Sequence, residues 1–262
     1  MSEKFYEVIN GGIRITRNKY FEKAVSLPNN ITIGRNVEIC ENVLLGEGVR
    51  IYNDVRIYDR AIIGDYVRIR DNVEIGRDVE ICRDVIIGEN VIIGHNVIIG
   101  VNVGIGNNVI IGDKVIIGEI AIISENVRIG RNVRIGENVK IGENVKICRD
   151  VEIGENVKIG ENVIICDSAK IHYNVLRHTK VLSFGELYRY KVTIYIQDTS
   201  EDVIIGLGCH HRTISEWESD FYNNPEEFPK GAPQTAEREF AFDIAKQIAE
   251  KKYSKYYKES GK

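Results

Sequence analysis

A six-residue repeat runs through the middle of this chain from Ile33 to Leu176 without an insertion. Its consensus is Ile-Gly-x-Asn-Val-x, and it occurs 24 times in succession. A short repeat of constant length predicts a solenoid in which each unit packs mainly on its neighbours. In each unit Val and Ile flank one variable residue, so the aliphatic side chains point inward and the variable one outward. The Gly-x-Asn segment predicts a corner, because Gly and Asn tolerate left-handed backbone.

Three corners close a triangle, so 18 residues form one coil and the 24 units form about eight uninterrupted coils. At about 4.8 Å per coil the prism would be roughly 38 Å tall. Ile and Val from three walls are expected to fill the interior, each contributing roughly 1.5–3 kcal/mol when fully buried. Binding sites are therefore expected on the outer faces, at corners, between subunits or outside the solenoid.

The repeat resembles that of the hexapeptide-repeat family, in which an aliphatic residue, a small residue, two variable residues and a small or β-branched residue recur. This resemblance implies a left-handed parallel β-helix and homotrimers around a threefold axis. An open solenoid end exposes unpaired backbone, so a cap is required. We expect a mainly β protein with an N-terminal cap at residues 1–30, the β-helix at residues 31–182, and a small α+β (ββαα) module at residues 183–262.

The composition changes near Ser183, after which aromatic residues become frequent. Alternation of apolar and polar residues predicts two strands, at residues 187–197 and 203–209. A capping-box signature predicts a helix over residues 213–221, and a second, longer helix is expected over residues 235–257. Such a module is large enough to fold on a neighbour but marginal by itself.

The stretch from Ile205 to Trp217 resembles a module of phage and prophage β-solenoid proteins, with a Gly-Cys strand end before a Thr-x-x-Glu-Trp helix start. The resemblance implies a phage-derived accessory protein and no particular activity. Within this stretch, Cys209 and His211 would share a strand face while His210 points away. Two ligands without a second pair are a weak zinc signal, so no metal is expected.

The outward residue of most units is charged, but in the middle coils it is Ile. Large exposed apolar patches usually mark interfaces, although Ile also favours strands at a surface. Val101 and Ile120 extend the apolar character onto a corner. We expect six isoleucines to form the interface of a homotrimer: Ile86, Ile92, Ile98, Ile110, Ile116 and Ile122.

Hexapeptide-repeat proteins are best known as acyltransferases, and the resemblance implies a His general base near an acyl thioester in a groove between subunits. His95 is the candidate, with Asp113 one coil away to orient its imidazole and support its protonated form. Against this, no loop interrupts the coils to build an acceptor pocket, and a solvated corner explains His95 equally. A carbonic anhydrase of the γ class would need three zinc histidines, and His172, His178 and His95 lack that spacing.

The overall composition excludes several classes of function. The net charge of −4 gives no footprint for nucleic acid or an anionic membrane surface. No signal peptide or spanning segment is expected. Five cysteines, an odd number, favour the reducing cytoplasm. Four of them replace the repeat Gly and are expected to fill its place as small residues: Cys40, Cys82, Cys148 and Cys166.

Two hypotheses follow. The first is a non-enzymatic trimeric binding or scaffold protein without a cofactor. It would offer its C-terminal module to a protein partner or sequester a small ligand between subunits. The alternative is an O- or N-acyltransferase in which His95 is the general base, Asp113 supports it, and acetyl-CoA or another acyl-CoA is the donor. The residues that would bind such a cofactor are not indicated by the sequence.

Overall fold

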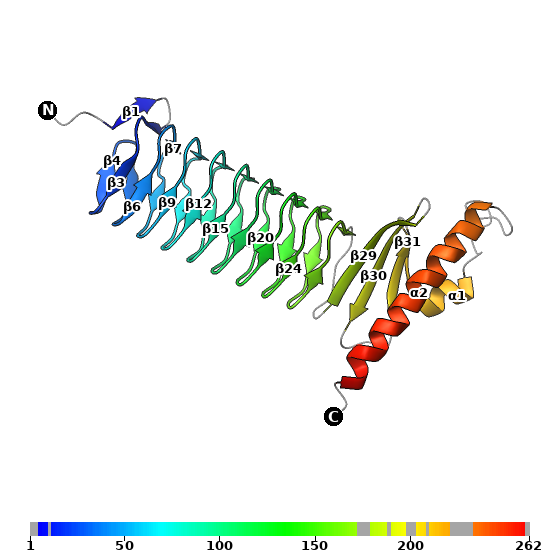
Figure 1. The fold of residues 1–262 in the computed structure, drawn as a ribbon. Coiled ribbons are helices and arrows are strands. Elements are labelled where there is room, and N and C mark those ends of the chain that lie inside the picture. The colour runs from blue at the N-terminus through cyan, green and yellow to red at the C-terminus, as the bar shows by residue number, and fades with distance from the viewer. Residues whose placement is uncertain are drawn as a thin grey trace.

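The protein is an elongated β-helix with strands closing one end and an α/β module at the other (Figure 1). It is mainly β, with about eight left-handed turns. The computed structural model describes residues 5–9, 12–171, 179–187, 190–197, 203–207, 210–220 and 233–259.

Each coil adds one short parallel strand to each of three sheets, which we call faces A, B and C. Face A contains β7 (Leu44–Gly46), β10 (Ile62–Ile63), β13 (Glu80–Ile81), β16 (Ile98–Ile99), β19 (Ile116–Ile117), β22 (Arg134–Ile135), β25 (Glu152–Ile153) and β28 (Lys170–Ile171). Face B contains β6 (Val37–Ile39), β9 (Arg56–Ile57), β12 (Glu74–Ile75), β15 (Ile92–Ile93), β18 (Ile110–Ile111), β21 (Arg128–Ile129), β24 (Lys146–Ile147) and β27 (Ile164–Ile165). Face C contains β5 (Ile31–Ile33), β8 (Arg50–Ile51), β11 (Arg68–Ile69), β14 (Ile86–Ile87), β17 (Gly104–Ile105), β20 (Ile122–Ile123), β23 (Lys140–Ile141) and β26 (Lys158–Ile159).

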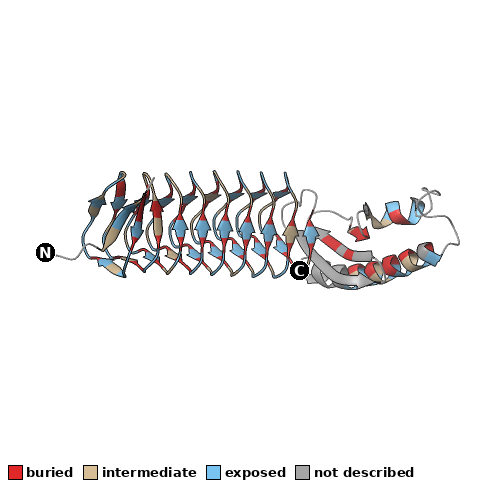
Figure 2. Cartoon of the chain, turned by 90° about the horizontal axis from the view of Figure 1, so that it is seen from above, coloured by how far each residue is buried: buried red, intermediate tan, exposed pale blue. Residues whose placement is uncertain are grey.

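Neighbouring coils are in register at a spacing of one coil, so Ile98 pairs with Ile116. The inward Val and Ile of each unit form one continuous core along the solenoid, while the outward residues of the strands stay largely exposed (Figure 2). Backbone hydrogen bonds join the coils, for example from Ile116 N–H to Val133 O at 2.9 Å. The period of six therefore produces the filled prism that the sequence predicts.

At the corners the repeat Gly has a different role from the one expected from the sequence. The left-handed backbone falls on the residue before the inward Val, Ala or Ile, a position that holds 23 of the 24 non-glycine residues with φ between 54° and 60°. Among the described glycines only Gly48, with φ of 67°, shares that conformation. The repeat Gly is instead favoured by close stacking, since a Cβ on Gly136 would lie 2.7 Å from the carbonyl carbon of Gly154. The assignment of left-handed backbone to the repeat Gly was therefore wrong.

Replacing Gly136 by Val should destabilise the solenoid by about 1–3 kcal/mol, because the added side chain forces two coils apart. The measurement is the free energy of unfolding from urea denaturation followed by far-UV circular dichroism. Glu137→Val is the matched control, since Glu137 is exposed at the same corner. Equal losses in the two variants would contradict the stacking argument.

The N-terminal residues pair antiparallel with all three strands of the first coil. Their strands are β1 (Tyr6–Ile9), β2 (Gly12–Ile15), β3 (Lys19–Phe21) and β4 (Val25–Leu27). β2 pairs with β7, β3 with β6, and β4 with β5. Ile13, Ile15 and Phe21 join the core of the prism. The first coil therefore has neither an open edge nor an exposed interior at this end.

The C-terminal module has four strands before its two helices, so the ββαα prediction was two strands short. Its elements are β29 (Thr179–Leu187), β30 (Tyr190–Gln197), β31 (Ile204–Leu207), β32 (His210–Thr213), α1 (Ile214–Asp220) and α2 (Pro233–Glu259). β29 begins before residue 183 and pairs parallel with β27, so it continues face B. β32 is polar in sequence and lacks the alternation that reveals a strand. The segment between the two helices, residues 221–232, lies outside the described residues.

A separate core joins the module's sheet to α2. Trp217, the single tryptophan of the chain, is buried there, and its Nε1–H donates to Ile205 O at 2.8 Å. The predicted capping box is present, since Glu216 accepts from Thr213 N–H at 2.8 Å and Glu216 N–H donates to Thr213 Oγ1 at 3.2 Å. The backbone hydrogen bond from Thr213 lowers the pKa of Glu216. No helix in the described part of the chain has the length and apolar character to cross a membrane.

Candidate functional site

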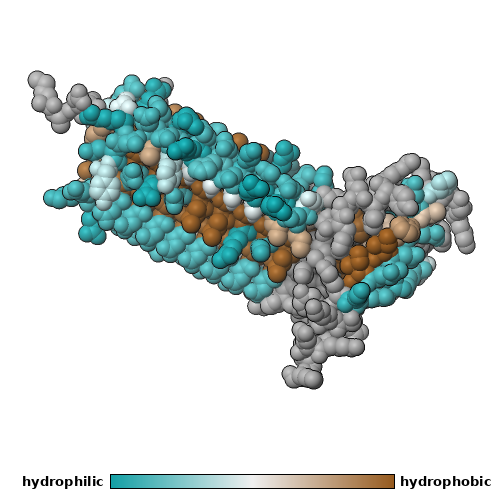
Figure 3. Space-filling view, viewed as in Figure 1, coloured by the Kyte–Doolittle hydropathy of each residue, from teal (hydrophilic) through white to brown (hydrophobic). Residues whose placement is uncertain are grey.

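The middle coils carry an apolar belt on their outer surface. Its side chains are between 39% and 47% exposed in one chain, and brown patches mark apolar residues along the coils in Figure 3. Ile92 pairs with Ile110 on face B and Ile98 with Ile116 on face A. Each face thus holds the pair that the sequence predicts. The belt consists of Ile86, Ile92, Ile98, Ile110, Ile116 and Ile122.

On face C the belt contains a notch at Gly104. This residue lies in register between Ile86 and Ile122, and a Cβ added to it would meet nothing within 4 Å. Nearby, Ile120 is 55% exposed and has φ of 59°, a conformation that is unfavourable for a β-branched residue. Neither residue is required by the winding of its own coil. Both are therefore candidates for contact with another molecule.

His95 lies exposed at the corner between faces B and A, but its contacts differ from the predicted dyad. Asp113 Oδ1 accepts from the backbone N–H of His95 at 2.8 Å. The ring Nδ1 of His95 accepts from the backbone N–H of Arg77 at 2.9 Å. A neutral imidazole with Nδ1 as acceptor carries its proton on Nε2. Asp113 therefore supports the backbone of His95 in this structure, and the expected contact with the imidazole is replaced by a main-chain contact.

The same hydrogen bond recurs at other corners with Asn or Asp as the acceptor. Asn107 Oδ1 accepts from Glu89 N–H at 2.8 Å, and Asp167 Oδ1 accepts from Arg149 N–H at 2.8 Å. His95 Nδ1 thus occupies the place of an Asn or Asp oxygen in a coil-to-coil ladder. The spacing of 18 residues was visible in the sequence, whereas the rotation of the ring toward the backbone was not.

Asparagine side chains stack into an amide ladder at one corner of the solenoid. Asn90 Nδ2 donates to Asn108 Oδ1, and Asn108 Nδ2 donates to Asn126 Oδ1, both at 3.2 Å. Hydrogen bonds between stacked amides hold successive coils together. The amide ladder therefore has a structural role.

Three of the four cysteines of the solenoid have surroundings that favour the thiol over the thiolate. Burial raises the pKa of the thiols of Cys40, Cys82 and Cys148, which keeps them protonated near neutral pH. Among the described residues no three His, Cys, Asp or Glu side chains gather as a metal site would require. Cys209, His172 and His178 lie outside those residues, as do the side chains of His210 and His211.

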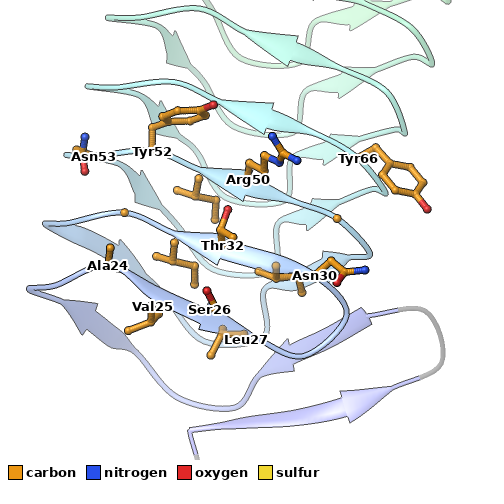
Figure 4. Close-up of a pocket in the computed structure, with 15 residues that line it drawn as sticks. Ala24, Val25, Ser26, Leu27, Asn30, Thr32, Arg50, Tyr52, Asn53 and Tyr66 are labelled. Carbon is orange, nitrogen blue, oxygen red and sulfur yellow. The ribbon is translucent and has the colours of Figure 1, made fainter.

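A shallow depression of about 1000 Å³ lies on face C at the capped end (Figure 4). Ser26, Thr32 and Arg50 line its middle, while Tyr52 and Tyr66 stand at its two sides. The sequence analysis did not select this surface. The signal was present, because Tyr52 and Tyr66 replace the repeat Gly and Asn in coils where aromatic residues are otherwise rare.

The profile of the family described as bacterial transferase hexapeptide (six repeats) matches residues 42–77, 67–100, 108–142, 120–153 and 132–167. All five matches lie within the solenoid. The repeats of the β-helix are therefore hexapeptide repeats of this family, as predicted. Comparison with curated proteins finds no significant match.

Solved structures with a similar winding include two UDP-N-acetylglucosamine acyltransferases. The Francisella novicida enzyme is 23% identical with a TM-score of 0.37, over 62% of this chain and 64% of that one. The Moraxella catarrhalis O-acyltransferase is 15% identical with a TM-score of 0.40, over 59% of this chain and 70% of that one. This chain thus spans just under two thirds of the Francisella enzyme. Similarity at this level describes the winding of the chain and not its chemistry.

Proposed function

We propose that this protein is a homotrimeric β-helix scaffold that binds a ligand or partner on its outer surfaces or between subunits. The main observation in support of this proposal is the apolar belt, whose isoleucines are 39–47% exposed on a single chain. Assembly around a threefold axis would remove this surface from water. Each Å² of apolar surface buried would stabilise the trimer by roughly 25 cal/mol. The proposal includes a cytoplasmic location, a phage origin and a C-terminal module available to a partner.

The geometry at the corners supports a scaffold over an enzyme. From Ile31 to Ile171 no insertion leaves the coils to form an acceptor pocket. A general base needs an unprotonated nitrogen facing the acceptor. In His95 the Nδ1 accepts from Arg77 N–H, so this nitrogen is already engaged and does not face an acceptor. His95 as observed is a structural acceptor.

Acyl transfer is the second candidate, and the family comparison favours it more directly than the scaffold, because the matching profile describes bacterial transferases. In this reaction a hydroxyl or amine attacks the acyl-CoA carbonyl, the C–S bond breaks, and coenzyme A leaves as the thiol. A base takes the proton of the attacking group. His95 would serve only after giving up its bond to Arg77 and shifting its tautomer.

One pair of measurements decides between these functions. Native mass spectrometry of the full chain should give three times the chain mass of 29.7 kDa. Thermal-shift titration with acetyl-CoA should leave the melting temperature unchanged for a scaffold. Stabilisation together with release of coenzyme A in the presence of an amine or alcohol would support the transferase. A monomer mass would contradict the proposed assembly.

A further inference from the structure

The capped end of face C departs from the repeat at three neighbouring positions. Tyr52 stands in the place of the repeat Gly. Tyr66 stands in the place of the repeat Asn, and Gly48 occupies that same position one coil earlier. The two tyrosines act against the local rules of the winding, and Gly48 leaves out the side chain that would block one of them. Departures from local rules that gather in one place are expected at functional sites.

Tyr66 is held outward in an unfavourable conformation. Its φ is 58°, in the left-handed region, and its side chain is 54% exposed. A Cβ on Gly48 would lie 2.6 Å from Cδ1 of Tyr66, so the ring lies over Gly48 and depends on its missing side chain. The pair Gly48 and Tyr66 thus fixes an aromatic ring at one side of the depression.

Two arginines are stacked without an acidic partner. Arg50 and Arg68 are in register on β8 and β11, and like charges placed directly opposite each other destabilise a sheet. Their backbone N–H groups join the coils, but within the described residues neither guanidinium group makes an ion pair or a hydrogen bond. On face B the same coils pair opposite charges instead, with Arg56 donating to Glu38 at 2.9 Å.

The floor of the depression is small and polar. Ser26, Thr32 and Arg50 follow one another in register across β4, β5 and β8. Two short hydroxyl side chains beside a long guanidinium and two tyrosine rings leave the hollow seen in Figure 4. Lys140 and Lys158 repeat a like-charge pair at the other end of face C, but there the adjoining corners hold no aromatic residue.

We propose that this depression binds a small organic anion through a phosphate or carboxylate at Arg50 and a ring against Tyr52 or Tyr66, with Arg68 of the next coil adding positive charge beside Arg50. We call it the cap-end site. Guanidinium groups recognise these anions with paired, charge-assisted hydrogen bonds. Tyrosine rings offer flat apolar area with little loss of conformational freedom. Every residue used belongs to one chain, and the site requires the capped end of face C to stay open in the proposed assembly.

The acidic residues at this end confine the anion to the arginine side. The Glu47 carboxylate raises the pKa of the Tyr66 phenol, with Asp65 acting in the same direction. Tyr66 therefore stays neutral, and the negative charge around it disfavours an anionic group at that edge. The ring and the anion of a ligand are thus directed to different parts of the site.

Isothermal titration of the full chain with glucose 6-phosphate, glucuronate, AMP and inorganic phosphate tests this site, with glucose as the neutral control. At least one ring-bearing anion should bind one site per chain, and more tightly than inorganic phosphate or glucose. Arg50→Gln should weaken that binding at least about tenfold, the effect of losing a charge-assisted hydrogen bond. Tyr66→Asn, which restores the repeat, should weaken the ring-bearing probe but not inorganic phosphate.

Lys140→Gln on the same face should leave the affinity unchanged, and far-UV circular dichroism confirms that each variant is folded. The site is rejected if none of the anions binds, if glucose binds equally well, or if Arg50→Gln binds like the unmodified protein. Because acetyl-CoA also carries phosphates, its titration against Arg50→Gln separates binding here from binding at His95.

Discussion

If the protein forms the proposed trimer, two glutamates placed on one face should convert it into monomers, and this should hold for two of the three faces. The variants are Ile98→Glu with Ile116→Glu on face A, Ile92→Glu with Ile110→Glu on face B, and Ile86→Glu with Ile122→Glu on face C. In a threefold assembly of triangular prisms, each prism turns two faces toward its neighbours. Burying two carboxylates per subunit without partners outweighs the apolar contact. Native mass spectrometry gives the result directly.

The third face supplies the internal control. Because these positions are 39–47% exposed in one chain, glutamate fits each isolated β-helix, and circular dichroism should show unchanged coils. The pair of faces that dissociates also identifies the groove in which a ligand would lie. Unchanged mass for all three variants would contradict the belt as an interface, and dissociation by all three would contradict a two-face trimer.

The solenoid was predictable from the sequence because one short pattern decides its local structure, register and core at once. Val133-Arg134-Ile135 specifies a strand with two inward side chains, and the next unit repeats it with no change of length. The same count of 18 residues placed Ile98 beside Ile116. Errors in such a chain do not accumulate, since every unit is an independent copy of the same signal.

The two ends were less predictable, because there the pairing is decided by neighbours in space. Strands as short as β3 and β4 have too few residues to show alternation, and they form because the first coil presents open edges to them. β29 likewise pairs with β27, although residues 166–178 separate the two strands in the sequence. A pattern within one segment contains no information about such an edge.

Among the site residues, positions were predictable and orientations were not. The repeat places Arg77, His95 and Asp113 in one column. It does not predict the side-chain rotamers, in which both His95 Nδ1 and Asp113 Oδ1 accept hydrogen bonds from backbone N–H groups. The cap-end site was missed for a related reason. Tyr52 and Tyr66 looked like isolated exceptions to the pattern, and only the fold brings them to opposite sides of Arg50.

Replacing His95 by Asn or by Ala should separate its structural role from a catalytic one. Asn retains an acceptor for Arg77 N–H, as Asn107 does for Glu89 N–H, so His95→Asn should match the unmodified protein in free energy of unfolding. His95→Ala removes the acceptor and should lose about 0.5–1 kcal/mol, at the low end of a net hydrogen bond because the corner is exposed. Urea denaturation followed by far-UV circular dichroism measures both.

A general base at His95 would give a different pattern, because neither Asn nor Ala accepts a proton near neutral pH. Both variants would then lower kcat/KM for acyl transfer by about 10²–10⁴. Asp113→Asn is the matched control, since the amide oxygen still accepts from His95 N–H but the charge is lost. If His95 is structural, His95→Asn and His95→Ala should differ in free energy of unfolding. If His95 is catalytic, both variants should lose acyl transfer to the same extent. Equal stability of the two variants would reject the ladder role, whatever the activity.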